Sequence, residues 1–318
     1  MAACRYRSRV ADLDLLVLGD ANPDLVLTGD VEPAFGQAEK LVDEARLVVG
    51  GSGAITACGA ARLGLRTAFV GVLGDDVLGR FMLGALAEAG VDVSGCVVDH
   101  ERPTGISVVL SRPEDRATLT APGTIAALRS ELVDRDLLRR ARHVHVSSYF
   151  LQRDLARDLP ALFEEAAAAG ATTSIDPNYD PRERWDGGLL ETLSRTDLFL
   201  PNSLEARAIG GSEDVDIAAQ VLGERARIVA VKFGQGGGLA ISGDEAVRSE
   251  AIPTEVVDTT GAGDSFDAGF IAGMLAGWPL ARCLALAVAC GSLSTRGVGG
   301  TAAQPTLLEA LAALEPTT

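Results

Sequence analysis

The most constraining feature of this sequence is the alternation of short apolar runs with longer, alanine-rich segments. The apolar runs have the length of buried strands, and the segments between them repeat apolar residues with a period near 3.6. Strands that alternate with helices at this spacing predict βαβ units and a mostly parallel sheet with helices packed on it. The expected strands lie at residues 15–18, 67–72, 143–146, 172–175, 198–200 and 228–231, and the expected helices at 54–63, 76–89, 153–169, 203–209, 214–223, 262–276 and 280–294.

Two segments interrupt this alternation. Residues 24–49 resemble strands punctuated by glycine and proline, and residues 104–120 resemble a hairpin with a polar turn at 112–115. Neither segment holds a helix long enough for a crossover connection. We therefore expect a single three-layer α/β/α domain over residues 1–318, with a small β-sheet lid formed by about 24–49 and 98–120. The alternative is that both segments are surface hairpins without a role in the reaction.

Length, charge and cysteine content limit the class of protein. A chain of 318 residues fits one large domain, and its net charge of −16 argues against nucleic acid or an anionic membrane as a partner. Five cysteines without C-x-x-C spacing predict neither a disulfide framework nor a zinc site. No apolar run is long enough to span a bilayer, and no secretory signal is evident. We expect a cytoplasmic protein.

The strongest chemical signal is Asp-Thr-Thr-Gly-Ala-Gly-Asp-Ser-Phe at residues 258–266, placed between a strand-like run at 255–257 and an apolar helix. Its glycines permit a tight bend, and the first amides of the following helix point outward as hydrogen-bond donors. Gly261, Ala262 and Gly263 are thus predicted to form an anion hole for a transferring phosphoryl group. Asp264 beside this hole is predicted to be the general base. The alternative is a tight turn in which Asp264 only caps the helix.

This motif closely resembles the C-terminal motif of the ribokinase-like (PfkB) carbohydrate kinases, and other segments resemble that family in the same order. The resemblance covers roughly residues 14–305. It implies a ribokinase-like fold and ATP-dependent phosphorylation of a sugar hydroxyl. The further matching segments are Gly-Asp-Ala-Asn-Pro-Asp at 19–24, Gly-Gly-Ser-Gly-Ala at 50–54, residues 60–64 and 71–79, Asp-Pro-Asn at 176–178, Pro-Asn-Ser-Leu-Glu at 201–205 and Lys-Phe-Gly-Gln-Gly-Gly at 232–237.

The resemblance also assigns roles to individual residues. It implies that ATP and Mg²⁺ take part and that the lids of two chains pair to form a homodimer. Binding of K⁺ is a further hypothesis from the resemblance. The implied acceptor-binding residues are Asn22, Asp24, Gly50, Gly51 and Ser52; the ATP-binding residues are Asn202, Lys232, Gly234 and Gly237; Glu205 places Mg²⁺; Asp258 and Thr260 lie at the monovalent cation. Taken alone, Asn22 and Asp24 are also good turn residues, and Asn202 with Glu205 also fits a helix N-terminal cap.

The sequence departs from the family at two positions of the diglycine motif. Ile55 stands where the family usually has an asparagine that contacts the sugar, and Ser52 replaces a frequent lysine. Phosphoryl transfer is therefore predicted, but no particular sugar. Two alternatives stay open: a nucleoside kinase of the same fold, and a non-catalytic sugar or nucleotide sensor. A Walker A loop is excluded, because neither Lys40 nor Lys232 follows a glycine.

Overall fold

The computed structural model describes residues 12–112 and 116–315. Its central sheet has the strand order β14-β13-β12-β11-β10-β9-β1-β4. Every neighbouring pair from β12 to β4 is parallel, whereas β13 and β14 add an antiparallel hairpin at one edge. The strands are β1 (Leu13–Leu18), β4 (Thr67–Val70), β9 (Ala141–Val146), β10 (Thr172–Ile175), β11 (Leu198–Phe199), β12 (Ile228–Lys232), β13 (Gly238–Ser242) and β14 (Glu245–Ser249).

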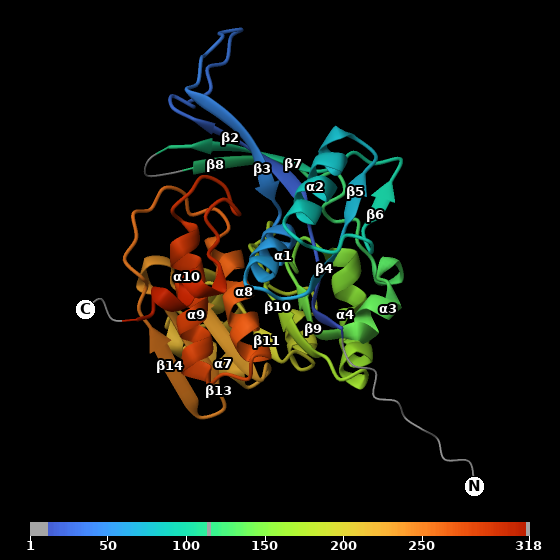
Figure 1. Cartoon of the computed structure of the whole chain (residues 1–318), viewed down its shortest axis with the longest axis vertical. Helices are drawn as coiled ribbons and strands as arrows, with labels where there is room; N and C mark the ends of the chain where they lie inside the picture. The colour runs from blue at the N-terminus through green and yellow to red at the C-terminus, as the bar shows by residue number, and fades with distance from the viewer. Residues whose placement is uncertain (1–11, 113–115, 316–318) are drawn as a thin grey trace.

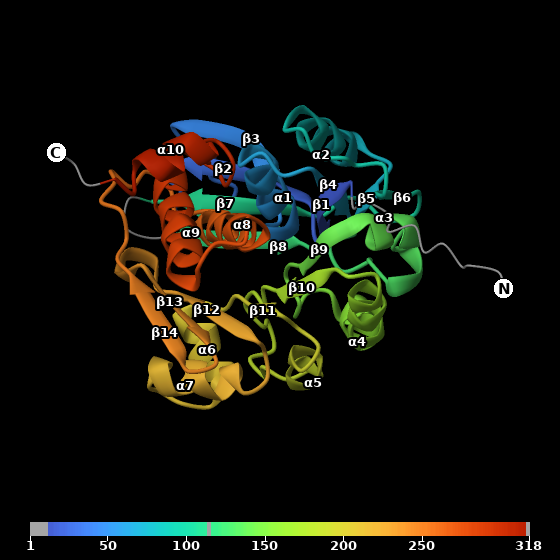
Figure 2. The same ribbon diagram turned by 60° about the horizontal axis from the view of Figure 1, so that its bottom comes forward.

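Helices cover both faces of this sheet, as Figures 1 and 2 show. All six residues of β1 are buried, which a parallel strand requires when both of its faces are covered. One apolar cluster contains residues of α3 (Arg135–Arg140), α4 (Arg153–Ala168), α5 (Leu189–Leu193), α6 (Ser203–Gly210) and α7 (Val215–Gly223). The other contains residues of α1 (Ser52–Arg62), α2 (Val77–Glu88), α8 (Ala262–Leu275), α9 (Leu280–Ser294) and α10 (Leu307–Ala312). Two short 3₁₀ turns, η1 (Ser130–Leu132) and η2 (Gly234–Gly236), complete the helices.

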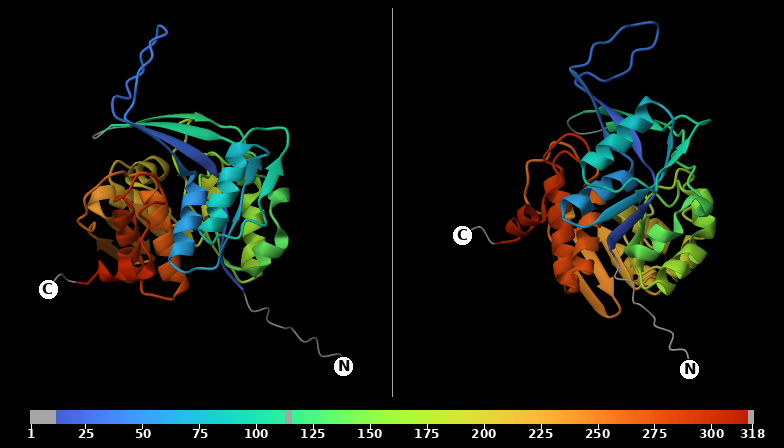
Figure 3. Two further views of the ribbon diagram at one scale, coloured as in Figure 1. Left: turned by 45° about the horizontal axis from the view of Figure 1, so that its top comes forward. Right: turned by 45° about the vertical axis from the view of Figure 1, so that its right-hand side comes forward.

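A separate four-stranded sheet crosses the top of the molecule, with the order β3-β2-β7-β8 (Figure 3). Strand β2 pairs antiparallel to β3 and parallel to β7, and β7 pairs antiparallel to β8. Its strands are β2 (Asn22–Thr28), β3 (Glu44–Gly50), β7 (Ile106–Ser111) and β8 (Arg116–Ala121). A short parallel pair, β5 (Val72–Gly74) with β6 (Val97–Asp99), lies beside it.

The predicted three-layer fold with a separate small sheet is confirmed, and most predicted elements are present with ends shifted by a few residues. Several local details differ, and the short helices α3, α5 and α10 were not predicted. The strand expected at 67–72 breaks after Val70, the strand-like run at 255–257 is not a strand, and the β13–β14 hairpin was not predicted. Of the turn expected at 112–115, residues 113–115 lie outside the described residues. No helix in the described ranges is both long and apolar enough to cross a membrane.

Candidate active site

A cavity of about 1200 Å³ lies between the carboxyl ends of the parallel strands and the small sheet. Open α/β sheets bind ligands at this edge, because the strand ends and helix starts meet there. Most of the predicted site residues line this one cavity. They are Asn22, Asp24, Gly51, Ser52, Asn202, Glu205, Lys232, Gly234, Gly237, Thr260, Gly261, Ala262, Gly263 and Asp264. Gly50 and Asp258, which are outside this lining, contact residues within it.

Asp264 lies in the first turn of α8, which begins after Gly261. Gly261 has a φ of 72°, and a Cβ there would come within 2.7 Å of the Gly300 Cα, so only glycine fits this turn without strain. The Ala262 N–H donates to the Thr259 carbonyl at 3.3 Å, whereas Gly263 and Asp264, whose amides belong to the first turn of α8, line the cavity as an anion hole requires. Ser52 Oγ, at the start of α1, donates a hydrogen bond to Asp264 Oδ1.

The environment of Asp264 holds its pKa far above that of an exposed aspartate. Burial is the main cause, and the nearby Asp176 carboxylate adds to it, which raises the pKa of Asp264 to about 7. The hydrogen bond from Ser52 and the charge of Lys232 oppose this shift without cancelling it. A carboxylate with a pKa near neutrality is suited to accept a proton from a hydroxyl at physiological pH.

Three buried charged groups lie behind Asp264. Lys232 Nζ, at the end of β12, is 3.0 Å from Asp176 Oδ2 and 3.1 Å from Asp267 Oδ1. Burial disfavours the ammonium form of Lys232, but the two carboxylates outweigh it and raise the Lys232 pKa. Burial raises the pKa of Asp267 well above its usual value, while Lys232 holds the pKa of Asp176 below its usual value despite burial. The lysine charge is therefore already compensated by protein carboxylates.

The opposite wall of the cavity carries polar groups at the start of β2. Asn22 Nδ2 donates to Asp24 Oδ1 at 3.2 Å and to Ser107 Oγ of β7 at 3.3 Å. Asp24 is 7% exposed, and burial raises its pKa to about 6. A Cβ on Gly50 would collide with the Asp24 carboxyl group, so this glycine makes room for the side chain. These groups can bind an acceptor hydroxyl through both donors and acceptors.

Asn202 and Glu205 form a complete capping box at the start of α6. Asn202 Oδ1 accepts from the Glu205 backbone N–H at 2.9 Å, and Glu205 Oε2 accepts from the Asn202 backbone N–H at 2.8 Å. Burial, with a contribution from Asp176, raises the Glu205 pKa to about 7. The pair thus has the capping role that its spacing also allowed, and both side chains still line the cavity. Gly234 has open space at its Cβ position, whereas a Cβ on Gly237 would collide with the Ser249 carbonyl.

The turn at residues 258–260, which precedes α8, is connected to the small sheet by a hydrogen bond. Asp258 Oδ1 accepts from the Thr260 backbone N–H at 2.9 Å and from the Thr260 hydroxyl at 2.7 Å, and Asp258 Oδ2 accepts from the Gly299 N–H at 2.8 Å. Arg116, on β8, donates to Thr260 Oγ1 at 2.8 Å and lies 3.9 Å from Asp258 Oδ1. The small sheet therefore contacts the turn that precedes α8 directly.

Several residues at the site carried no recognised signal in the sequence. Arg116 lies 144 positions before Thr260, and nothing local indicates its contact. Asp267 looks like an ordinary polar residue in a helix. Gln304 is 2% exposed and donates to the Ile55 carbonyl at 3.0 Å and to Ser265 Oγ at 3.1 Å, so it joins α1 to α8. A glutamine surrounded by small residues offers no comparable motif.

A ligand cavity at the carboxyl edge of a parallel sheet, a helix N-terminus for a phosphoryl group and a carboxylate beside it define a phosphotransferase class of site. Residues 12–307 match the pfkB family carbohydrate kinase description. The chain belongs to this family and is an ATP-dependent carbohydrate kinase. Its curated relatives include a fructokinase from Klebsiella pneumoniae, 34% identical over 309 residues and covering 91% of this chain and 95% of the relative.

Further proteins are similar to this chain in sequence or in fold. An ATP-dependent ribose-1-phosphate kinase from Halopiger xanaduensis is 33% identical over 294 residues, covering 92% of this chain and 95% of the relative. A solved E. coli structure described as a ribokinase II in complex with ATP and Mg²⁺ superimposes with a TM-score of 0.84 at 25% identity, covering 95% of this chain and 99% of that one. An adenosine kinase from Sinorhizobium meliloti superimposes with a TM-score of 0.83 at 27% identity, with the same coverage.

Proposed function

We propose that Asp264 is the general base that activates a hydroxyl of a sugar-like acceptor for attack on the γ-phosphorus of ATP. The hydroxyl proton passes to Asp264, a new oxygen–phosphorus bond forms, and the bond between the γ-phosphorus and the bridging oxygen breaks to leave ADP. The backbone of Gly261, Ala262 and Gly263 at the α8 N-terminus stabilises the charge on the transferring group. The observation that carries this proposal is the position of Asp264 beside that N-terminus, with a pKa of about 7.

The acceptor lies between β2 and the start of α1 in this proposal. Asn22 and Asp24 bind its hydroxyls, and Gly50 and Gly51 bring the backbone close to it. Ser52 positions Asp264 through its hydrogen bond. Ile55, buried at the cavity wall in place of an asparagine, adds apolar surface against which a carbon skeleton packs.

The nucleotide lies between α6, η2 and α8. Gly234 and Gly237 leave its part of the cavity open, Asn202 supplies polar contacts, and Lys232 holds Asp176 and Asp267 in place beneath the phosphates. Glu205 is the proposed Mg²⁺ residue. Its carboxylate offers the oxygen ligands that suit this ion, and it lines the same cavity. Mg²⁺, when bound, neutralises phosphate charge during transfer.

Asp258 and Thr260 are the proposed site of a monovalent cation. Their turn leads directly into the anion hole, so a cation there would stabilise the turn and the charge beside it. The test is the rate in K⁺, Na⁺ and tetramethylammonium at constant ionic strength. An equal rate in all three salts would contradict this site.

The small sheet is the proposed lid, formed by about residues 24–49 and 98–120, and the proposed contact between two protomers. Large apolar side chains are exposed on β3, on β8 and in the loop between β2 and β3: Phe35, Leu41, Leu47 and Leu119. A homodimer that buries this apolar patch together with the outer edges of β3 and β8 would shield the apolar side chains and the unpaired strand edges from water. The test is sedimentation velocity of the wild type and of a Phe35→Ser, Leu119→Ser variant. A monomeric wild type would contradict the dimer.

The proposed compartment is the cytoplasm, which supplies ATP and keeps thiols reduced. The four cysteines in the described residues are free thiols, and this supports the proposal. Labelling of these thiols in freshly lysed cells without reductant tests it, and a disulfide-bonded state would contradict it.

The principal experiment measures ADP release with Mg-ATP across neutral sugars, sugar acids and nucleosides. Turnover on one class, lost by about 10²–10⁴-fold in Asp264→Asn, would support the proposed base. The matched control is Asp244→Asn, which removes an exposed carboxylate from the turn between β13 and β14 and should leave the rate unchanged. Equal rates in wild type and Asp264→Asn would contradict the proposed base while leaving the kinase assignment intact.

A further inference from the structure

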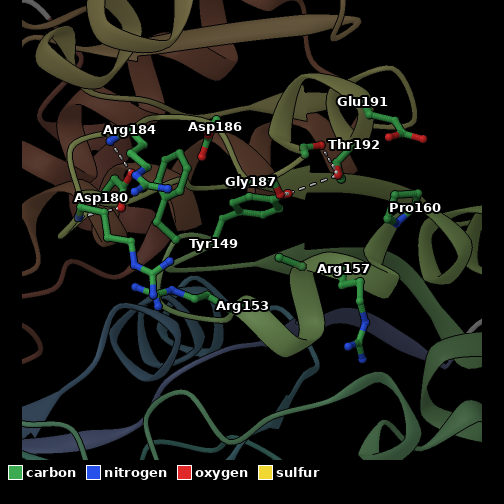
Figure 4. Close-up of a pocket in the computed structure, with 14 residues that line it drawn as sticks. Tyr149, Arg153, Arg157, Pro160, Asp180, Arg184, Asp186, Gly187, Glu191 and Thr192 are labelled. Carbon is green, nitrogen blue, oxygen red and sulfur yellow. Dashed lines mark hydrogen bonds between the residues drawn. The ribbon is translucent and has the colours of Figure 1, made fainter.

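A second cavity, of about 390 Å³, lies apart from the active site on the face of the sheet covered by α4 and α5 (Figure 4). Tyr149 and Phe150 form an aromatic wall, and the first turns of α4 form another side. The segment 180–188 and the start of α5 complete it. This volume lies within the range of small-molecule sites.

The lining contains four arginines, Arg153, Arg157, Arg182 and Arg184, in a chain whose net charge is −16. Arg157 pairs with its neighbour Asp158 at 3.2 Å. Within residues 12–112 and 116–315, no side-chain hydrogen bond or ion pair is found for the other three. Figure 4 shows Arg153 and Arg184 on the same side of the pocket as Asp180, and Arg157 further along it.

The carboxylate nearest these arginines is already satisfied by the backbone. Asp180 is 5% exposed and accepts hydrogen bonds from the backbone N–H groups of Arg182, Arg184 and Trp185 at 2.9, 2.8 and 2.9 Å. These bonds fold the segment so that its arginines surround the cavity. Asp186 and Glu191 are exposed, as are the four arginines, so these two carboxylates are solvated by water and are not held against the guanidinium groups. The guanidinium donors therefore remain available to an anion from solution.

The longer segment 176–188, which includes residues 180–188, also reaches the active-site cavity, where Asn178 and Tyr179 belong to the lining. An edge-to-face aromatic chain joins the two cavities: Tyr179 contacts Trp185 at 5.4 Å between ring centroids, and Trp185 contacts Phe150 at 5.6 Å. Asn178, Glu183 and Trp185 have φ values of 53°, 52° and 56°. Asparagine tolerates this region, but glutamate and tryptophan adopt it at a cost, and residues held in this way cluster at ligand-binding and switch segments.

We propose that this pocket binds a small phosphorylated metabolite, and that its occupation changes the affinity of the active site for the acceptor. Guanidinium groups bind phosphate oxygens in pairs of charge-assisted hydrogen bonds, and Tyr149 and Phe150 offer a surface for the carbon skeleton. Segment 176–188 carries the coupling, since it lines both cavities. The second half of the proposal rests on the proposed acceptor site, but the first half does not.

The binding test uses calorimetry with glycerol 2-phosphate as the phosphate ester and succinate as the carboxylate probe. A saturating non-hydrolysable ATP analogue with Mg²⁺ occupies the catalytic anion hole throughout. Arg153→Gln, Arg182→Gln should weaken glycerol 2-phosphate binding at least about tenfold, because each arginine contributes charge-assisted bonds. The matched control, Arg129→Gln, Arg225→Gln, removes two exposed arginines elsewhere and should bind as the wild type does.

Three results would overturn the binding half. They are no saturable binding at millimolar probe, equal affinity in the two double variants, or tighter binding of succinate than of the phosphate ester. The first two would mean that the arginines form an ordinary solvated surface. The third would mean that the pocket selects a carboxylate.

The coupling test uses Trp185 as a reporter. The chain has two tryptophans, so Trp278→Phe leaves Trp185 as the only indole. Glycerol 2-phosphate should change the Trp185 emission, with the same dissociation constant that calorimetry gives, and it should change the acceptor KM. The acceptor should in turn change the affinity for glycerol 2-phosphate by the same factor as glycerol 2-phosphate changes the affinity for the acceptor. Binding that leaves emission and KM unaltered would overturn the coupling. Loss of all turnover with binding and emission response intact would instead count against the proposed function alone.

Discussion

Replacing Asp264 by asparagine should abolish most of the activity and, at the same time, stabilise the protein. The pKa of this carboxyl group is about 7 in the folded chain, against 3.8 for an ordinary aspartate. A raised pKa means that the folded state binds the proton more tightly than the unfolded state does. The stability that this proton contributes is complete below pH 3.8 and is lost as the pH rises through about 7.

The magnitude follows from the size of the shift. Three pKa units at about 1.36 kcal/mol each give an upper limit of about 4 kcal/mol for the cost of ionising Asp264 in the folded protein. Asparagine cannot ionise, and its side-chain oxygen can still accept the hydrogen bond from Ser52. The variant should thus gain about 1.5 kcal/mol at about pH 5 and up to about 4 kcal/mol at about pH 8, where the gain corresponds to roughly 6 °C in Tm.

Thermal unfolding of both proteins across this pH range measures the effect. The quantity of interest is the difference in Tm between variant and wild type at each pH, because other titrating groups are common to both chains. Asp244→Asn, which changes an exposed carboxyl group, should show no such trend. A Tm difference that stays constant from about pH 5 to about pH 8 would refute the reasoning, because it would mean that Asp264 ionises as an exposed aspartate does.

Three further substitutions test the surroundings of the base. Ser52→Ala removes a donor to the Asp264 carboxylate and should shift the acidic limb of the kcat/KM profile upward by about one pH unit; an unshifted limb would contradict this. Gly261→Ala should lower both Tm and kcat, whereas Gly243→Ala, also at positive φ but with open space around it, should lower Tm less. Lys232→Met leaves two buried aspartates without their cation and should lower the free energy of unfolding in denaturant by about 3–5 kcal/mol. The decrease should be larger at high pH than at low pH, and a decrease independent of pH would argue against this explanation.

The parts of the molecule that the sequence predicts are those encoded by contiguous residues. Parallel strands buried on both faces appear as short apolar runs, and β10 occupies Thr172–Ile175 as expected. The turn at the start of α8 is similarly local, because Gly261 and Asp264 follow one another closely in the sequence and lie where the motif predicts a helix to begin. The β13–β14 hairpin was not predicted although Gly243 and Asp244 mark its turn, because β14 is largely exposed and lacks the apolar run of a buried strand.

Long-range contacts account for most of what was not predicted. Lys232 was expected among nucleotide-lining residues; its partners Asp176 and Asp267 come from β10 and α8, and only the fold brings the three charges together. The contact of Arg116 with Thr260 depends on how the small sheet lies over the main domain. A sequence pattern reports the chemistry of a residue, but not which distant charge will neutralise it.

The distribution of charge in the active-site cavity bears on which acceptors the kinase will use. Asp20, Asp24 and Asp264 all line the cavity where the acceptor is proposed to bind, and burial raises the pKa of each because their charged forms are poorly solvated there. Of the two cations in the lining, Lys232 is held by buried aspartates and Arg116 contacts the turn before α8. A neutral polyol can donate hydrogen bonds to these carboxylates, whereas an anionic acceptor would add repulsion to groups that already ionise reluctantly. Neutral sugars should accordingly show lower KM values than the corresponding sugar acids, and the reverse order would mean that Arg116 leaves its turn to bind the acceptor.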